Sequence, residues 1–252
     1  RSPTVTGVQT CALPIYAVIV VATIKALKYN GGADVKDITQ ENLDALANGL
    51  PNLYKHVENI TDVFGLPAVV AINRFVSDTE AEIGLLKKSC EERGITVALA
   101  DVWGQGGKGG IDVTQAVIKL CDENVGREHF TYAYDLDQPL MAKITTLAQK
   151  IYGADGVDFA PEAQKALAKF EKLGYGNLPV CMAKTQYSLS DDASKLGRPT
   201  DFTITVRDAT ISAGAGFVVC LTGAIMKMPG LPLHPAAEKI DVDENGVISG
   251  LF

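Results

Sequence analysis

The stretch from Leu66 to Gly110 constrains the fold most, because it reads as a single βαβ unit. The apolar run from Ala68 to Ile72 lacks alternation, which is typical of a parallel strand covered on both faces. Ile95 to Ala100 is the second predicted strand. A right-handed crossover between parallel strands would bring the carboxyl ends of both strands to the same edge of the sheet.

A helix is predicted between these two strands. Ser77 and Glu80 stand in the S-x-x-E relation of a capping box, and Gly94 is the expected C-terminal stop. Apolar residues recur between them at helical spacing, so one face of the helix should be buried. The residues of this face are Ile83, Leu86 and Cys90.

Two aromatic residues follow the ends of the predicted strands. Phe75 comes after the first strand and Trp103 after the second, so the two rings are expected to lie near each other. Open α/β sheets bind ligands in the crevice beyond the carboxyl ends of their strands. The expected ligand is therefore flat and heteroaromatic. The alternative is that each ring packs beneath its own loop.

The glycine-rich segment from Gly104 to Gly110 favours either a backbone cradle for an anion or a loop without a ligand. It is not a Walker A motif, because Lys108 is followed by Gly109 and no G-x-x-x-x-G-K-[ST] occurs in the chain. Ser212 to Phe217 is not a dinucleotide fingerprint either, since its glycines precede a predicted strand instead of opening a helix.

Composition excludes several function classes. A formal charge of -7 and a pI near 5.0 argue against nucleic acid or an anionic membrane as a partner. The apolar run from Ala12 to Ala22 is too short to span a bilayer. Five widely spaced cysteines without C-x-x-C indicate reduced thiols and a cytoplasmic location. The three histidines are isolated, so no metal-ligand spacing appears.

The chain divides into three predicted parts. Residues 1–15 show no helical or strand period and read as a non-native leader. Residues 16–126 form an α/β region that carries the aromatic site, and residues 127–252 form a C-terminal mixed α/β subdomain. The boundary between the last two parts is marked by no linker rich in proline, serine or glycine.

The α/β region should contain further elements. Ala17 to Ala22 reads as a buried strand that continues through residues 23–30. Asp37 is predicted to begin one helix and Pro51 to open the next. Ile111 to Asn124 is predicted to be a helix with four inward apolar residues, which are Val113, Ala116, Val117 and Leu120.

The C-terminal part is predicted to combine helices with a hairpin. The helices are Gln138 to Tyr152 and Pro161 to Leu173, and Leu178 to Met182 is a short strand. Phe202 to Val206 and Phe217 to Leu221 follow as further strands. Met228 to Pro232 is predicted to form a tight turn. Five charged residues either serve an anionic ligand or pair with one another at the surface; they are Lys184, Asp191, Asp192, Arg198 and Arg207.

Several runs of the sequence resemble the formate-tetrahydrofolate ligase family. They are Ala71 to Glu80, Trp103 with its glycine segment, Pro179 to Asp192, Ser212 to Phe217, Met228 to Pro232 and the ending Ile240 to Phe252. The resemblance covers about residues 16–252. It implies a parallel-sheet βαβ region of the P-loop NTPase-like type, followed by a smaller mixed α/β subdomain.

The resemblance also implies a reaction: the ATP-dependent joining of formate to tetrahydrofolate through formyl phosphate, which gives 10-formyltetrahydrofolate. Phe75 and Trp103 match the two family positions whose rings sandwich the folate ring system. Leu99 matches an apolar wall residue near that site. The family uses ATP with Mg²⁺, has a monovalent-cation site, and is implied to be a homotetramer in the cytoplasm.

The chain also departs from the family pattern. Family members are about twice this length, and their ATP phosphate loop and catalytic cations lie in an N-terminal half with no counterpart here. Asn30 stands where the family has a histidine in Lys-x-His-Gly-Gly. We therefore expect this fragment to be inactive alone, with no catalytic residue of its own. The alternative is a non-catalytic α/β ligand-binding or interaction module.

Overall fold

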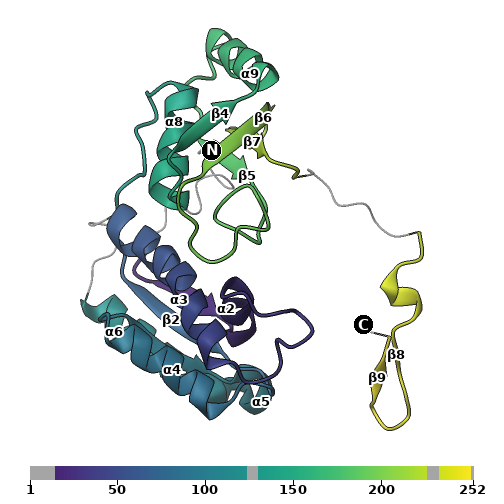
Figure 1. Cartoon of the computed structure of the whole chain (residues 1–252). Coiled ribbons are helices and arrows are strands. Elements are labelled where there is room, and N and C mark those ends of the chain that lie inside the picture. The colour runs from purple at the N-terminus through teal and green to yellow at the C-terminus, as the bar shows by residue number, and fades with distance from the viewer. Residues whose placement is uncertain (1–14, 124–129, 226–232, 251–252) are drawn as a thin grey trace, which may run out of the picture.

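The computed structural model describes residues 15–123, 130–225 and 233–250. The first part of the chain forms a three-stranded sheet of β1 (Val18–Ala22), β2 (Ala68–Asn73) and β3 (Thr96–Ala100), in that order (Figure 1). All neighbouring strands are parallel. The predicted βαβ unit is therefore confirmed, including the common edge at which β2 and β3 end.

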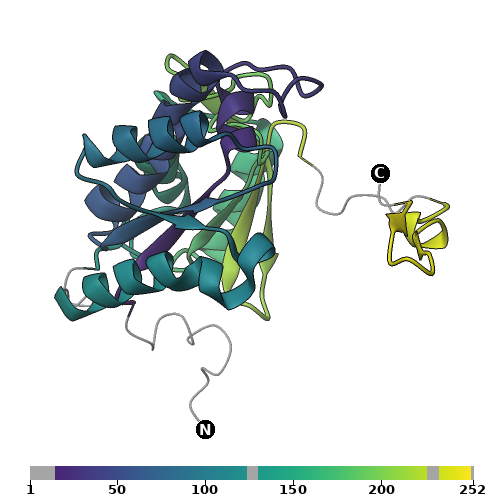
Figure 2. The ribbon, with the colours of Figure 1, turned by 90° about the horizontal axis from the view of Figure 1, so that it is seen from below.

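The two faces of this sheet are covered differently. Val20, Val70 and Val97 share one register row, on the face covered by α2, α3 and α4. Helix α6 lies along the opposite face, beside β2 and β3 (Figure 2). Since α6 does not reach β1, the side chains of Ile19 and Val21 stay exposed on that face. The prediction of a buried first strand is thus right for one face only.

The strand β1 does not continue to residue 30 as predicted. Helix α2 (Ile24–Asn30) begins directly after it, because the Thr23 hydroxyl accepts a hydrogen bond from the Ala26 N–H and caps the first turn. The apolar residues of α2 then recur at helical spacing, with Ile24 and Leu27 buried in the core.

A single helix, α3 (Leu43–Glu58), replaces the two predicted around Pro51, and a π-helical turn η1 (Asn59–Val63) follows it. Asn42 caps its start in place of the predicted Asp37. A proline inside a helix costs about 3 kcal/mol. Full burial of one Leu or Val side chain returns roughly 1.5–3 kcal/mol, and four are buried on one face across the proline. They are Leu46, Leu50, Leu53 and Val57.

Helix α4 (Glu80–Glu91) is capped two residues later than predicted. Thr79 and Glu82 form the capping box, because the Thr79 hydroxyl accepts from the Glu82 N–H and the Glu82 carboxylate accepts from the Thr79 N–H. Ser77 instead belongs to the turn after β2. The predicted inward residues of this helix are all buried, and Gly94 ends the segment with φ of 69°.

The glycine-rich segment is helical and not an open loop. It runs from α5 (Val102–Gln105) through a 3₁₀ turn, η2 (Gly106–Gly110), into α6 (Ile111–Glu123). The four predicted inward residues of α6 are all half-buried, as is Cys121, and this is expected for a helix that lies on one sheet face.

The second sheet has the strand order β4-β6-β7-β5. β6 (Thr203–Ser212) and β7 (Phe217–Thr222) form an antiparallel hairpin, as predicted. β5 (Val180–Ala183) pairs parallel to β7, and β4 (Gly156–Phe159), which the sequence did not predict, pairs parallel to β6.

Helices α8 (Leu140–Leu147) and α9 (Pro161–Lys172) pack on the second sheet. A π-helical turn, η3 (Ala148–Tyr152), extends α8 to the predicted end at Tyr152. Pro161 opens α9, and Gly174 follows it with φ of 85°. These helices and the sheet enclose a separate hydrophobic core, so each sheet has its own.

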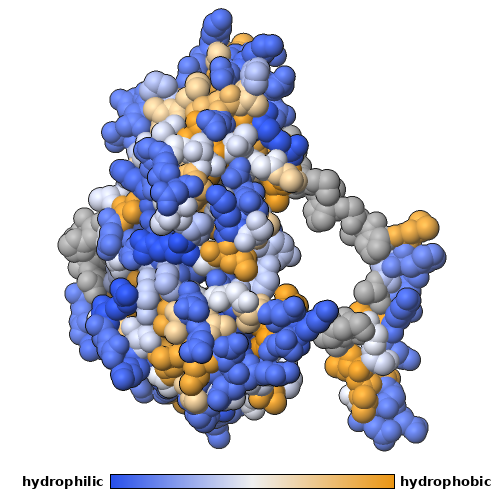
Figure 3. All heavy atoms as spheres, in the orientation of Figure 1, coloured by the Kyte–Doolittle hydropathy of each residue, from blue (hydrophilic) through white to orange (hydrophobic). Residues whose placement is uncertain are grey.

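The C-terminal segment contains a 3₁₀ turn, η4 (Ala236–Glu238), and a short hairpin of β8 (Asp241–Val242) and β9 (Ile248–Ser249). This hairpin stands clear of the body and carries exposed hydrophobic side chains (Figure 3). Three predictions lie largely or wholly outside the described residues: the leader over 1–15, the boundary at 126/127, and the turn from Met228 to Pro232.

Candidate ligand site at the carboxyl edge of the parallel sheet

A buried carboxylate fixes the turn that presents Phe75. The Asp78 Oδ2 atom accepts from the Phe75 N–H at 2.8 Å, and the Asp78 N–H donates to the Phe75 carbonyl at 3.0 Å. Burial raises the pKa of Asp78, although the hydrogen bond from Phe75 and the nearby charge of Lys25 oppose that shift. The ring of Phe75 is thereby held at the end of β2 with 40% of its surface exposed.

Trp103 lies in α5, just after β3, and is 84% exposed. The segment around it is tightly folded, since the Asp101 N–H donates to the Gly109 carbonyl at 3.0 Å. A Cβ atom at residue 109 would lie 2.1 Å from the Asp101 carbonyl oxygen, so only glycine fits there. This glycine thus serves a close backbone approach beside Trp103.

Phe75 and Trp103 line one cavity of about 710 Å³ at this edge of the sheet. The other lining residues are Lys25, Asn73, Arg74, Val76 and Ser77. The structure therefore brings together the two rings that the βαβ geometry predicted to be neighbours. Their role as a stacking pair stays a prediction.

Leu99 lies apart from the aromatic cavity. It faces the core of the first sheet in β3 and lines a different cavity between α4 and α6. Its predicted role as a wall residue of the ligand site stays a prediction, without a contact to the cavity that holds the rings.

The two cations of the aromatic cavity differ in their partners. The Arg74 guanidinium forms an ion pair with Glu80 at 2.8 Å and lies 3.9 Å from the Asp101 carboxylate. Lys25 Nζ instead lies 4.7 Å from the centre of the Phe75 ring, in a cation–π contact. Sequence reasoning missed Lys25, although its position just after β1 matches those of Phe75 and Trp103 after their own strands.

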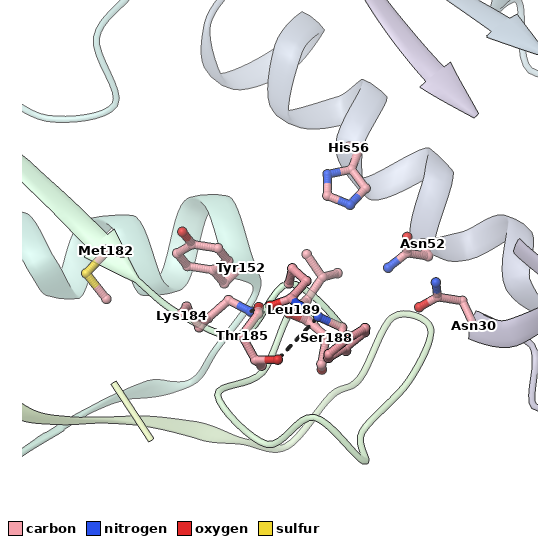
Figure 4. A pocket seen from close by; sticks show the side chains of 11 residues that line it. Asn30, Asn52, His56, Tyr152, Met182, Lys184, Thr185, Ser188 and Leu189 are labelled. Carbon is pink, nitrogen blue, oxygen red and sulfur yellow. Dashed lines mark hydrogen bonds between the residues drawn. The ribbon is translucent and has the colours of Figure 1, made fainter. Parts of the chain in front are cut away.

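A second cavity, of about 220 Å³, lies between the two sheets' helices and loops. Figure 4 shows His56 and Asn52 from α3 and Asn30 from the end of α2 facing the segment that carries Lys184. The lysine ammonium donates to the carbonyls of Thr185, Ser188 and Ser190. Burial lowers its pKa to about 8. Because all three N–H donors are used, Lys184 holds this loop in shape.

The other charged candidates also make internal contacts. Arg198 forms two hydrogen bonds with the Glu58 carboxylate, at 2.6 and 2.8 Å. Asp191 accepts from the Thr205 N–H, and Arg207 donates to the Ile225 carbonyl. Arg198 therefore forms a surface ion pair, but with Glu58 and not with another of the five predicted residues.

A comparison with protein-family models identifies the family of the chain. The model described as formate-tetrahydrofolate ligase matches residues 8–252 of the chain, which is nearly its whole length. The chain belongs to the formate-tetrahydrofolate ligase family. The match begins at residue 8, inside the segment that the sequence analysis set apart as a leader. The family is one of ligases that act on formate and tetrahydrofolate.

Among the residues that the structure describes, no cluster of histidine, cysteine and acidic side chains could hold a metal ion. None of the described helices is both long and apolar enough to cross a membrane. Four described cysteines are free thiols; they are Cys90, Cys121, Cys181 and Cys220.

Proposed function

We propose that the carboxyl edge of β1, β2 and β3 binds the pteridine ring of tetrahydrofolate, within a ligase that makes 10-formyltetrahydrofolate from formate and ATP through formyl phosphate. The observation that carries this proposal is the pair of exposed rings, Phe75 and Trp103, on one cavity. Two exposed aromatic rings that line the same cavity form a contiguous apolar surface, which is typical of a ligand-binding groove.

Stacking on these rings would orient the substrate without taking part in the chemistry. Each ring is worth roughly 1–3 kcal/mol by analogy with nucleobases on aromatic side chains. The Asp78 carboxylate holds the backbone of Phe75 in place, so the turn that carries the ring is already ordered and loses little backbone entropy when a ligand stacks on the ring. Together the two rings contribute about 2–6 kcal/mol, which corresponds to a dissociation constant between tens of millimolar and tens of micromolar.

The ATP-dependent steps are a separate part of the proposal. Residues 1–252 contain no G-x-x-x-x-G-K-[ST] motif, and the described residues contain no cluster of three or more histidine, cysteine or acidic side chains that could hold a metal ion. We therefore derive no step through a metal and propose that these residues alone do not turn over ATP. The free thiols support a reducing compartment such as the cytoplasm, and a homotetramer is proposed from the family alone.

Tryptophan fluorescence tests the folate site directly, because Trp103 is the only tryptophan in the chain. Saturating tetrahydrofolate should quench or shift the emission. Phe75→Leu should weaken that binding about 5- to 150-fold while leaving the indole in place. Tyr187→Leu, which alters an exposed ring outside this cavity, is the matched control. Unchanged emission on adding tetrahydrofolate would contradict the stacking assignment.

A formyl-transfer assay tests the second part. Chain 1–252, incubated with formate, ATP and tetrahydrofolate, should give no 10-formyltetrahydrofolate above the background without protein. Measurable ATP-dependent product would show that a phosphate-binding arrangement exists within these residues. Binding without turnover would also separate the ligase fragment from an interaction module that has no affinity for folates.

A further inference from the structure

The topology of the first sheet places three side chains at the same edge, and each belongs to the segment that follows one of the three strands. Lys25 follows β1, Phe75 follows β2 and Trp103 follows β3, and the strands are neighbours in that order. The lining of the cavity therefore combines a cation, which lies over the phenyl ring, with an indole that follows the neighbouring strand. A ligand that fills it lengthwise combines a flat ring with a negatively charged group.

Lys25 is the cation free to meet that negative group. The other lining cation, Arg74, is already paired with Glu80 and lies near Asp101. Within the described parts of the chain, Lys25 Nζ has no carboxylate within ion-pair distance, and its recorded contact is the face of the Phe75 ring at 4.7 Å. The buried carboxylate of Asp78 is engaged by the Phe75 N–H.

We infer that Lys25 is the anion-binding group of this cavity, which selects tetrahydrofolate by a carboxylate of its glutamate tail over a tetrahydropterin that lacks the tail. The inference rests on the proposed folate site and adds its specificity. When the pteridine stacks on Phe75, the Lys25 ammonium leaves the face of the phenyl ring or moves to its edge. It then exchanges its cation–π contact for a charge-assisted hydrogen bond to the ligand carboxylate.

The experiment compares two ligands on the intact 252-residue chain by Trp103 emission: tetrahydrofolate and 6-methyltetrahydropterin. Lys25→Met should weaken tetrahydrofolate binding about tenfold and change tetrahydropterin binding less than about twofold. Lys25→Arg, which keeps the charge, should restore most of the difference. Lys88→Met removes an exposed lysine of α4 instead, and should leave both affinities unchanged.

The outcomes separate this inference from the proposed function. Equal weakening of both ligands by Lys25→Met would mean that the lysine acts only by positioning Phe75, which overturns the inference and leaves the folate site standing. No emission change with either ligand overturns the folate site and the inference together. The unsubstituted chain gives a further reading if a variant fails to fold. Added salt should weaken the binding of tetrahydrofolate and leave the binding of the tetrahydropterin unchanged. Equal salt dependence of the two affinities would contradict a role for the ammonium.

Discussion

The two sheet regions each bury a lysine, and they stabilise it differently. In the first region Lys28 is 1% exposed and its Nζ lies 2.7 Å from Glu82, which is fully buried; it also donates to the Gln40 carbonyl. In the second region Lys143 is fully buried and donates to the carbonyls of Gly176 and Leu178, and no carboxylate of the described residues lies at ion-pair distance from it. One ammonium is paired with a charge and the other is solvated by backbone dipoles.

The difference reflects what each lysine fastens. The Lys28–Glu82 pair joins α2 to α4. The Asn42 N–H, at the start of α3, donates to the same carboxylate and so ties a third helix to the pair. Lys143 instead holds the chain that leads from α9 into β5. Burial alone would raise the pKa of Glu82, but the hydrogen bonds from Lys28, Asn42 and Thr79 outweigh it and lower that pKa.

Removing the charge of Glu82 should have the largest effect. Glu82→Gln leaves the Lys28 ammonium buried without a counter-charge, which typically costs about 3–5 kcal/mol of the free energy of unfolding. Because the folded-state pKa of Glu82 lies below its unfolded value, its contribution is complete above about pH 4.5 and is lost as the pH falls through the folded pKa. Urea denaturation at pH 7 and pH 4 should show the gap to the unsubstituted chain shrinking in acid.

Glu80→Gln is the matched control for that change, since Glu80 is an exposed acid of the same helix that pairs with Arg74. A surface pair is worth about 0.2–1 kcal/mol. Equal losses for the two variants would show that the buried pair contributes no more than an exposed one, and the contrast between the two lysines would lose its basis.

Lys143→Met should cost less, about 1–3 kcal/mol, because it removes a desolvated charge together with the donor of two carbonyls. Burial lowers the pKa of Lys143 below 10.5, so the unfolded chain binds this proton more tightly. The contribution of this lysine to stability therefore rises as the pH increases through the folded pKa toward 10.5. Denaturation at pH 7 and pH 9.5 should show a gap that widens in base, and a gap that narrows would contradict the assignment.

The sequence predicted the fold best where one pattern determined the structure. The continuous apolar run of β2 and the spacing of Ile83, Leu86 and Cys90 identified a covered strand and its crossover helix. Prediction from the sequence was wrong where two local signals competed. Ser77 and Thr79 both begin an S/T-x-x-E pattern, and only the tertiary demand for Glu82 beside Lys28 decides between them. Pro51 signals a helix start, but the buried face of α3 overrides it.

The candidate site was predictable in its rings and not in its cation. Phe75 and Trp103 follow apolar strands that can be recognised from sequence, and the parallel crossover brings them together. The role of Lys25 was not predicted because residues 23–30 read as a continuation of β1, which would have placed this side chain along a strand. The helix that begins after Thr23 turns Lys25 toward Phe75, and the Thr23 hydroxyl caps its first turn.

The smallest effect is expected at the ion pair that joins the two regions. Arg198 and Glu58 are 40% and 36% exposed, so a double-mutant cycle with alanine at both positions should give a coupling of about 0.2–1 kcal/mol. The regions should still unfold together, because Asn52 donates to the Gly197 carbonyl and Asn59 to that of Ile151 across the same junction.

Thiol labelling along a urea gradient checks this cooperativity region by region. Cys90 is buried in the first core and Cys220 in the second, and burial raises their pKa values to about 11 and about 12, so both thiols are protonated at pH 8. Each should react only when its own core opens. We expect one shared midpoint in the unsubstituted chain and in the Arg198→Ala variant. Separate midpoints would show that the two sheets are independent folding units, with Cys90 reporting the ligand-binding one.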